Sequence, residues 1–299
     1  MNSADELLAE AEARSSAIWA RRSGSALDDA PRDDDQFRQA FDAFVSRGDS
    51  ERAVRLVLAL RDVWWARGQY AEGLAWIDKV LALPAVPSAS RAAVLDQAGA
   101  LAFAQGQYAR ARHFFEASLD LRRSSGSTRD LALTLNHLAA ALRWGCIDAV
   151  AAVPIYHESL ALARQAGDRR LVGAALMPLG TLALDRGALA QAQRLLEAGL
   201  QQYIEAEVET ALPLALEQFA AIAAVRRQAV RALRLASAGA VWRRNLGTYP
   251  TPYGAWVERY ISLARLMLPE AQAREAWQAG EAMSLEQAIV YALDDEASA

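Results

Sequence analysis

The segments ARGQYAEGLAWIDKVLAL (66–83) and AQGQYARARHFFEASLDL (104–121) decide the fold, because they are two copies of one pattern. A third copy is DRGALAQAQRLLEAGLQQ (185–202). Each copy has a glycine, a Tyr or Leu two residues later, a small residue three further on, and a large apolar residue four beyond that. The first two glycines lie 106 − 68 = 38 residues apart, and the third follows after 187 − 106 = 81 residues, which is two periods of about 40. The chain is therefore an internal repeat.

Two weaker units complete the array. Residues 134–163 have a glycine, Gly145, about where the turn is due, and residues 216–238 carry Arg227 in place of the glycine. A left-handed turn would cost a non-glycine residue roughly 1–2 kcal/mol, so we expect a different turn at Arg227. Apolar and small residues before the turns follow helical spacing, and strand patterns are missing. Each unit therefore predicts helix A, a short turn and helix B.

This is the tetratricopeptide pattern, and it predicts an all-α fold. We expect a right-handed α-α superhelix, a TPR-like solenoid of about five helix pairs with capping helices at both ends. Residues 1–49 would form N-terminal helices and an acidic loop, residues 50–243 the repeats, and residues 244–299 an aromatic loop and C-terminal capping helices. All would belong to one continuous solenoid domain. Pro178 falls inside a helix A and predicts a kink.

The resemblance extends beyond the repeat. DQFRQAFDAFVSRGD (35–49), VWWARGQYAEGLAWIDKVLALP (63–84) and AWQAGEAMSLEQAIVYAL (276–293) resemble the C-terminal helical region of bacterial STAND-type ATPases and their LuxR- and AfsR-like transcriptional regulator relatives. In the last segment Ser284 and Gln287 also form a capping-box pattern. The resemblance implies a region that senses a signal or holds a partner. The ATPase and DNA-binding parts are expected to be absent, so the chain is either a stand-alone relative or a fragment of a longer regulator.

Composition excludes several classes of function. The net charge of −4 argues against direct nucleic-acid binding. Lys79, the only lysine, has no glycine-rich loop around it, which excludes a Walker-type nucleotide site. A single cysteine, Cys146, excludes an intramolecular disulfide. With no secretory signal and no apolar run long enough for a membrane span, a cytoplasmic location is expected.

Chemical sites are not indicated by the sequence. The histidines His113, His137 and His157 form no metal-binding pattern, and Cys146 is typical of a small buried apolar residue. Acidic residues are so abundant that a pair such as Glu217 and Asp185 is expected by chance, so it is weak evidence for acid-base catalysis. We therefore expect no cofactor, no metal and no enzymatic activity.

The groove of the solenoid is the better-founded binding site. In tetratricopeptide superhelices the A helices line the concave face, and alignment on the turns carries their recurring positions onto this chain. The position ten residues before the turn, the position three before it and their neighbours give the candidate residues Leu58, Asp62, Trp65, Asp96, Phe103, Asn136, His137, Arg143, Trp144, Met177, Thr181 and Glu217. The alternative role for these residues is packing between repeats, and it is favoured for Leu58.

Three functional hypotheses follow, and the least favoured is an enzyme built on the solenoid scaffold. The first is a non-enzymatic scaffold that binds a protein or peptide in the groove. The second is a sensor that encloses a small molecule or signal peptide between repeats three and five, with the aromatic loop 249–256 as a lid and the kink at Pro178 beside the pocket. The alternative role of the stretch 244–256 is a loop that packs its aromatic side chains on the end of the solenoid. The adjacent tryptophans should differ in role: Trp64 aligns with small residues and would fill the core, whereas Trp65 aligns with Phe103 and would line the groove.

Overall fold

The computed structural model describes residues 3–21, 34–125, 127–145, 149–245 and 253–294. Within these ranges every regular element is a helix, which confirms the all-α prediction. The chain forms two compact units, Met1–Leu162 and Ala163–Ala299, and each is described by itself. The division falls inside the helix Ala149–Gln165.

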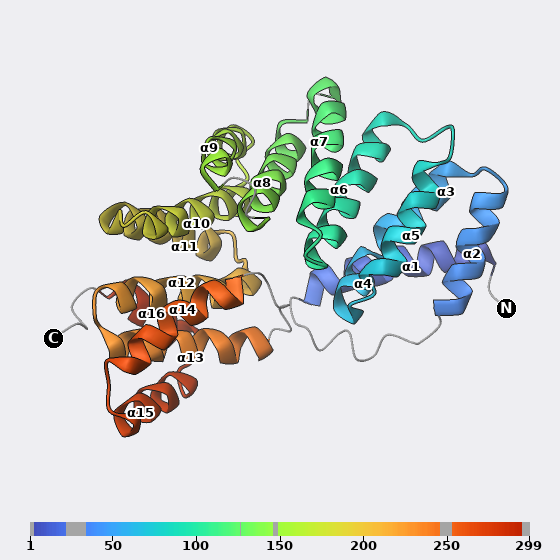
Figure 1. The fold of residues 1–299 in the computed structure, drawn as a ribbon. Coiled ribbons are helices and arrows are strands. Elements are labelled where there is room, and N and C mark those ends of the chain that lie inside the picture. The colour runs from blue at the N-terminus through green and yellow to red at the C-terminus, as the bar shows by residue number, and fades with distance from the viewer. Residues whose placement is uncertain (1–2, 22–33, 126, 146–148, 246–252, 295–299) are drawn as a thin grey trace. The chain divides into compact units, whose positions relative to one another are not determined.

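The first unit contains two N-terminal helices and the first three repeats (Figure 1). Its helices are α1 (Ala4–Arg21), α2 (Asp34–Ser46), α3 (Ser50–Ala59), α4 (Arg61–Arg67), α5 (Tyr70–Leu81), α6 (Ser88–Ala104), α7 (Tyr108–Ser125), α8 (Thr128–Trp144) and most of α9 (Ala149–Gln165). Helix A of repeat one is divided at Leu60 into α3 and α4. Repeats two and three are the pairs α6/α7 and α8/α9.

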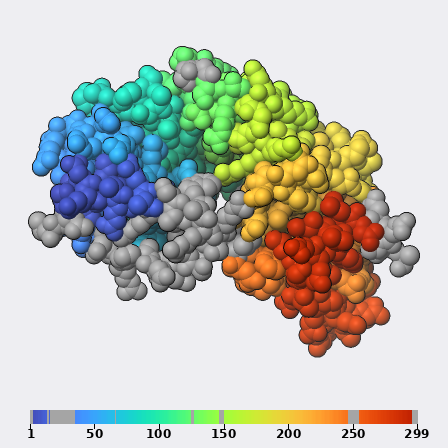
Figure 2. Space-filling view, turned by 180° about the vertical axis from the view of Figure 1, so that it is seen from behind, coloured from blue at the N-terminus to red at the C-terminus, as the bar shows by residue number. Residues whose placement is uncertain are grey.

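The second unit contains repeats four and five and the C-terminal helices. Its elements are α10 (Arg169–Asp185), α11 (Leu189–Glu205), the 3-10 helix η2 (Glu209–Ala211), α12 (Leu212–Val225), α13 (Ala229–Asn245), α14 (Tyr253–Leu266), α15 (Glu270–Glu281) and α16 (Leu285–Leu293). The C-terminal helices, red in Figure 2, lie against α12 and α13 of the same unit. The capping box of Ser284 and Gln287 opens α16 as predicted.

The turns inside repeats one, two, four and five are left-handed, including the one that lacks a glycine, whereas Gly145 of repeat three has a φ of −72°. Gly106 has a φ of 73° and Gly187 one of 77°, and Arg227 adopts the same region with a φ of 63°. The hydrogen bonds agree as well, since the amides of Gly187 and Arg227 both donate to the carbonyl three residues earlier. The expectation of a different turn at Arg227 is therefore wrong. The shared turn hydrogen bonds and the packing of α12 on α13 outweigh the intrinsic cost of about 1–2 kcal/mol.

Close contact of the two helices in a repeat requires small residues at fixed positions. A side chain on Gly99 of α6 would overlap the ring of Phe115 on α7. Repeat one meets the same requirement with the sizes exchanged, because Trp64 replaces the alanine found in repeats two and four as Ala102 and Ala183. A Cβ on Gly73 would lie 2.7 Å from Trp64 Cε3, so the glycine of α5 makes room for the tryptophan of α4.

Trp64 belongs to the core, as predicted. It is buried, and its ring meets that of Trp76 edge-on with centroids 5.6 Å apart. Trp76 in turn stacks on Phe41 of α2 at 4.3 Å, which joins the N-terminal helices to repeat one. Trp64 and Trp76 therefore fix the N-terminal helices to the end of the solenoid.

One other expectation changes. The sequence predicts a non-helical stretch over 244–256, but α13 runs to Asn245 and α14 begins at Tyr253, while residues 246–252 lie outside the described part of the chain. Pro178 lies inside α10 as predicted, and the kink there stays a prediction.

Candidate functional site

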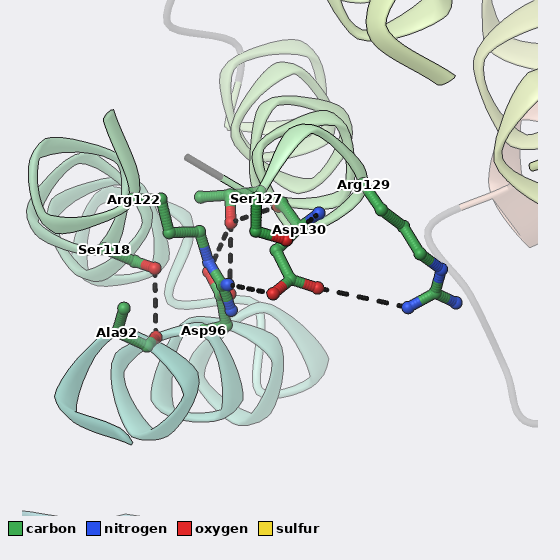
Figure 3. Close-up of polar contacts among 8 residues, drawn as sticks. Ala92, Asp96, Ser118, Arg122, Ser127, Arg129 and Asp130 are labelled. Carbon is green, nitrogen blue, oxygen red and sulfur yellow. Dashed lines mark hydrogen bonds and ion pairs between the residues drawn. The ribbon is translucent and has the colours of Figure 1, made fainter. Parts of the chain in front are cut away.

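Asp96 forms part of a polar cluster, defined by the buried Asp96, Arg122 and Thr134 and the more exposed Asp130, that joins three helices (Figure 3). Arg122 of α7 donates to Asp96 Oδ2 of α6 through Nε at 2.9 Å and Nη2 at 2.5 Å. Thr134 Oγ1 of α8 lies 3.0 Å and 3.1 Å from the two Asp96 oxygens. Asp130, also of α8, lies 2.9 Å from Arg122 Nη1. The cluster therefore ties repeat two to repeat three.

This geometry corrects the prediction that Asp96 lines a groove. The Arg122 and Asp96 side chains are only 9% and 10% exposed, and both carboxylate oxygens of Asp96 already have partners. A carboxylate held in this way contributes to the packing of the repeats and does not face a ligand.

Repeat five contains the same arrangement. Glu217 of α12 pairs with Arg243 of α13, whose Nη1 lies 2.7 Å from Oε1 and 2.9 Å from Oε2. The separation of 243 − 217 = 26 residues equals that of Asp96 and Arg122, 122 − 96 = 26. Burial raises the pKa of Glu217 from 4.5 to about 7, although the charge of Arg243 opposes the rise. Glu217 is only 2% exposed, so it too is turned into its repeat and is not accessible to a ligand in the groove.

The register of repeat three follows from a second repeated bond. Ser118 Oγ donates to the carbonyl of Ala92 at 3.0 Å, and Ser159 Oγ donates to that of Ala132 at 2.8 Å. The A helices are thus 132 − 92 = 40 residues apart and the B helices 159 − 118 = 41, which places one extra residue in the turn of repeat three. Asn136 therefore occupies the position of Asp96, as the sequence alignment expected, and it is half-buried.

Three more predicted residues are buried. Met177 fills the space left by Gly199, where a Cβ would lie 2.6 Å from its Sδ. Thr181 is completely buried and donates to the carbonyl of Pro178 at 2.9 Å. Arg143 is also buried, and its guanidinium carbon lies 4.6 Å from the centre of the Trp144 ring. These three side chains are inside the repeats, and the groove prediction is not retained for them.

The remaining candidates keep part of their surface exposed, and all belong to the first unit. Trp65 meets Tyr70 edge-on at 5.7 Å, and Phe103 meets Tyr108 in the same way at 5.2 Å. The tyrosine two residues after each turn thus supports the aromatic residue three before it. The predicted groove residues that are half-buried are Leu58, Asp62, Trp65, Phe103, Asn136, His137 and Trp144. We call this set the A-helix face; its role in binding stays a prediction.

Sequence reasoning missed the partners of the buried acids. Arg122 and Arg243 lie on B helices, and a search confined to A helices could not find them. The signal was present, because an acid and an arginine recur 26 residues apart in repeats two and five. Gln97, beside Asp96, was also missed; it is buried and donates through Nε2 to the carbonyl of Val57 at 3.0 Å.

The lid of the second hypothesis cannot be placed. Tyr249 lies outside the described residues, and Trp256, which does not, is a buried residue of α14. Its Nε1 donates to Asp185 Oδ1 at 2.8 Å, and Arg259 Nη2 reaches the same oxygen at 2.8 Å. Asp185 therefore holds α14 against the end of α10. Nothing in the described residues tests the lid, so the sensor hypothesis stays a prediction.

Searches of the described residues for two other kinds of site give negative findings. No group of three or more His, Cys, Asp or Glu side chains among them could hold a metal ion. No helix in the same part of the chain is long and apolar enough to cross a membrane.

Comparison with known proteins identifies the fold. No protein-family model matches the sequence, and no curated protein does. Among solved structures, the TPR-like repeats of a kinesin light chain from Podosopora anserina match with a TM-score of 0.53 and 16% identity, over 69% of this chain and 99% of that one. The fold is a TPR-like solenoid.

Two further structures are similar over most of the chain. Aspartyl phosphate phosphatase F from Bacillus subtilis matches with a TM-score of 0.57 and 11% identity, over 91% of this chain and 76% of that one. A Rap protein in complex with competence and sporulation factor also has a TM-score of 0.57, at 13% identity, over 97% and 96% of the two chains. At these identities the similarity establishes the shared solenoid fold.

Proposed function

We propose that this protein is a non-enzymatic binding module that takes up a protein or peptide segment on the A-helix face of its first three repeats. The observation that carries the proposal is the aromatic pair Trp65 and Phe103. These residues occupy one position in successive repeats, and each is half-buried although the residue just before it, Trp64 or Ala102, is buried. Exposed aromatic side chains on a rigid surface are typical anchors of binding interfaces. A solenoid presents such side chains at regular intervals along an extended surface.

A solved structure with a similar fold supports the proposed binding of a peptide or protein. One similar solenoid is a Rap protein that was solved with competence and sporulation factor bound to it. We propose a comparable role here, in bacterial cytoplasmic signalling, which also agrees with the resemblance of the C-terminal segment 276–293 to STAND-type and LuxR- or AfsR-like regulators.

The test compares the wild type with a double variant, Trp65→Ala and Phe103→Ala, as immobilised full-length proteins exposed to a display library of random 12-residue peptides. We expect the wild type to enrich specific peptides that the double variant does not retain. Arg123→Ala is the matched control, since its side chain is 59% exposed and lies on helix B of repeat two. Circular dichroism confirms that each variant is folded. Equal retention of the enriched peptides by the folded double variant would show that the A-helix face is not the binding site.

A further inference from the structure

One position of the A helices is half-buried in the first unit and completely buried in the second. In repeat two it is Ala100, and in repeat three it is Ala140, 140 − 100 = 40 residues later; both are half-buried. In repeats four and five it is Thr181 and Ala221, six residues before their turns (187 − 181 = 6 and 227 − 221 = 6), and both are 0% exposed. A further element of the second unit therefore covers the A helices at this position.

Helix α14 is the element that lies there. It packs against α12, the A helix of repeat five (Figure 1). It is also bonded to the end of α10, the A helix of repeat four, because Trp256 Nε1 and Arg259 Nη2 each donate to Asp185 Oδ1 at 2.8 Å. Asp185 lies four residues after Thr181, so the two residues share one face of α10. Helix α14 therefore lies across the A helices of repeats four and five.

The side chains that α14 turns toward the solenoid form one apolar face. Each is at most 8% exposed, and they follow the spacing i, i+1, i+4, i+5 and i+8, as Trp256, Val257, Tyr260, Ile261 and Ala264. This spacing is that of an amphipathic helix. The second unit thus contains an amphipathic helix bound to the A-helix side of its own repeats.

We propose that the partner segment taken up by the first unit is also an amphipathic helix, which lies across α6 and α8 with its apolar face on Ala100 and Ala140. The inference rests on the proposed function and specifies its ligand. Helices α6 and α8 pack against each other. Ala100 shares a face of α6 with Phe103, and Ala140 shares a face of α8 with Trp144, because the spacings are three and four residues. Small side chains beside aromatic ones leave room for a helix and supply apolar contacts to it.

An extended segment is the alternative ligand, and this surface suits it less well. An extended segment depends on the groove to satisfy its backbone N–H and C=O groups. The position itself offers only the methyl groups of Ala100 and Ala140. One helical turn earlier in repeat two, Asp96 is already bonded to Arg122 and Thr134. A helix satisfies its own backbone hydrogen bonds and needs an apolar surface, which this position provides.

The first test uses the random 12-residue peptide library with the wild type, Ala100→Arg and the control Ala109→Arg, all as full-length proteins whose folding is checked by circular dichroism. Ala109 is exposed and lies on helix B of the same repeat. We expect the wild type and Ala109→Arg to enrich the same peptides, with apolar residues at helical spacing. Ala100→Arg should bind them at least about tenfold more weakly, because the long side chain occupies the place of the helix.

The outcomes separate this inference from the proposed function. Enriched peptides that depend on Trp65 and Phe103 but lack helical spacing would overturn the inference and leave the proposed function intact. Full binding by the folded Ala100→Arg variant would do the same. A library from which nothing is enriched would overturn both.

A synthetic peptide tests the helix without any change in the protein. In the strongest binder, one residue in the middle of the polar side is replaced by proline in one peptide and by alanine in another. We expect proline to weaken the Kd for the wild type by about a hundredfold relative to alanine, because it removes a helical hydrogen bond and clashes with the preceding turn. An extended peptide accommodates both residues, so a difference of less than about twofold would refute the helical ligand.

Discussion

Removing the guanidinium of Arg122 should destabilise the first unit far more than removing a surface charge. In Arg122→Met the side chain keeps much of its length but no longer pairs with Asp96, which is 10% exposed. Thr134 Oγ1 would remain as a donor to that carboxylate. Leaving a buried charge without its ionic partner costs about 3–5 kcal/mol.

The assay is urea unfolding of the full chain, followed by circular dichroism, with the free energy of unfolding compared between variants. The matched control is Arg123→Met, one residue along the same helix. Arg123 lies 3.7 Å from Asp120, and both side chains are more than half exposed. An exposed pair of this kind contributes about 0–1 kcal/mol, so the two neighbouring substitutions should differ by about 3 kcal/mol.

A double variant separates the loss of the pair from the loss of packing. Asp96→Leu combined with Arg122→Met removes both buried charges, and Thr134 can still donate to the carbonyl of Asp130 at 3.1 Å. We expect the double variant to recover most of the stability lost in Arg122→Met, because apolar groups can replace a buried pair at little cost. The reasoning fails if Arg122→Met unfolds like Arg123→Met, or if the double variant is no more stable than Arg122→Met.

Three further predictions concern the second unit. A Cβ on Gly280 would overlap Arg234 O, so Gly280→Ala should lower the free energy of unfolding by about 3 kcal/mol, while Gly254→Ala, with nothing within 4 Å, should raise it by about 0.5–1 kcal/mol. Because the pKa of Glu217 is raised from 4.5 to about 7, the folded state binds its proton more tightly than the unfolded state, and this contribution to stability, about 3 kcal/mol, is lost as the pH rises through that window. Urea unfolding between pH 4.5 and 8 should therefore show a decline in the wild type that is smaller in Glu217→Gln, and parallel curves would contradict the assignment. Arg227→Gly relieves a φ of 63° and should raise the free energy of unfolding by up to about 1 kcal/mol, which thermal unfolding would show as a higher midpoint. A lower midpoint would show that the arginine side chain stabilises the fold by more than its backbone strain costs.

The repeat, its glycine turns at Gly68, Gly106 and Gly187, and the separate position of Trp64 could be predicted from sequence, because each follows from spacing and residue size. The turn at Arg227 could not, since an intrinsic preference of about 1–2 kcal/mol is smaller than the packing that fixes the turn. The burial of Asp96 and Glu217 could not either. Acidic residues on a helix are usually solvated, and only the arginines of the following B helices make burial of these two acceptable.

The position ten residues before the turn shows why the binding surface is narrower than the sequence suggests. In repeats two and five it holds an acid paired with an arginine, and in repeat four it holds Met177 packed on Gly199. A side chain turned into its own repeat cannot also contact a ligand. Under the proposed function, recognition in repeat two would therefore fall to the residues nearer the turn, where Trp65 and Phe103 are half-buried in repeats one and two.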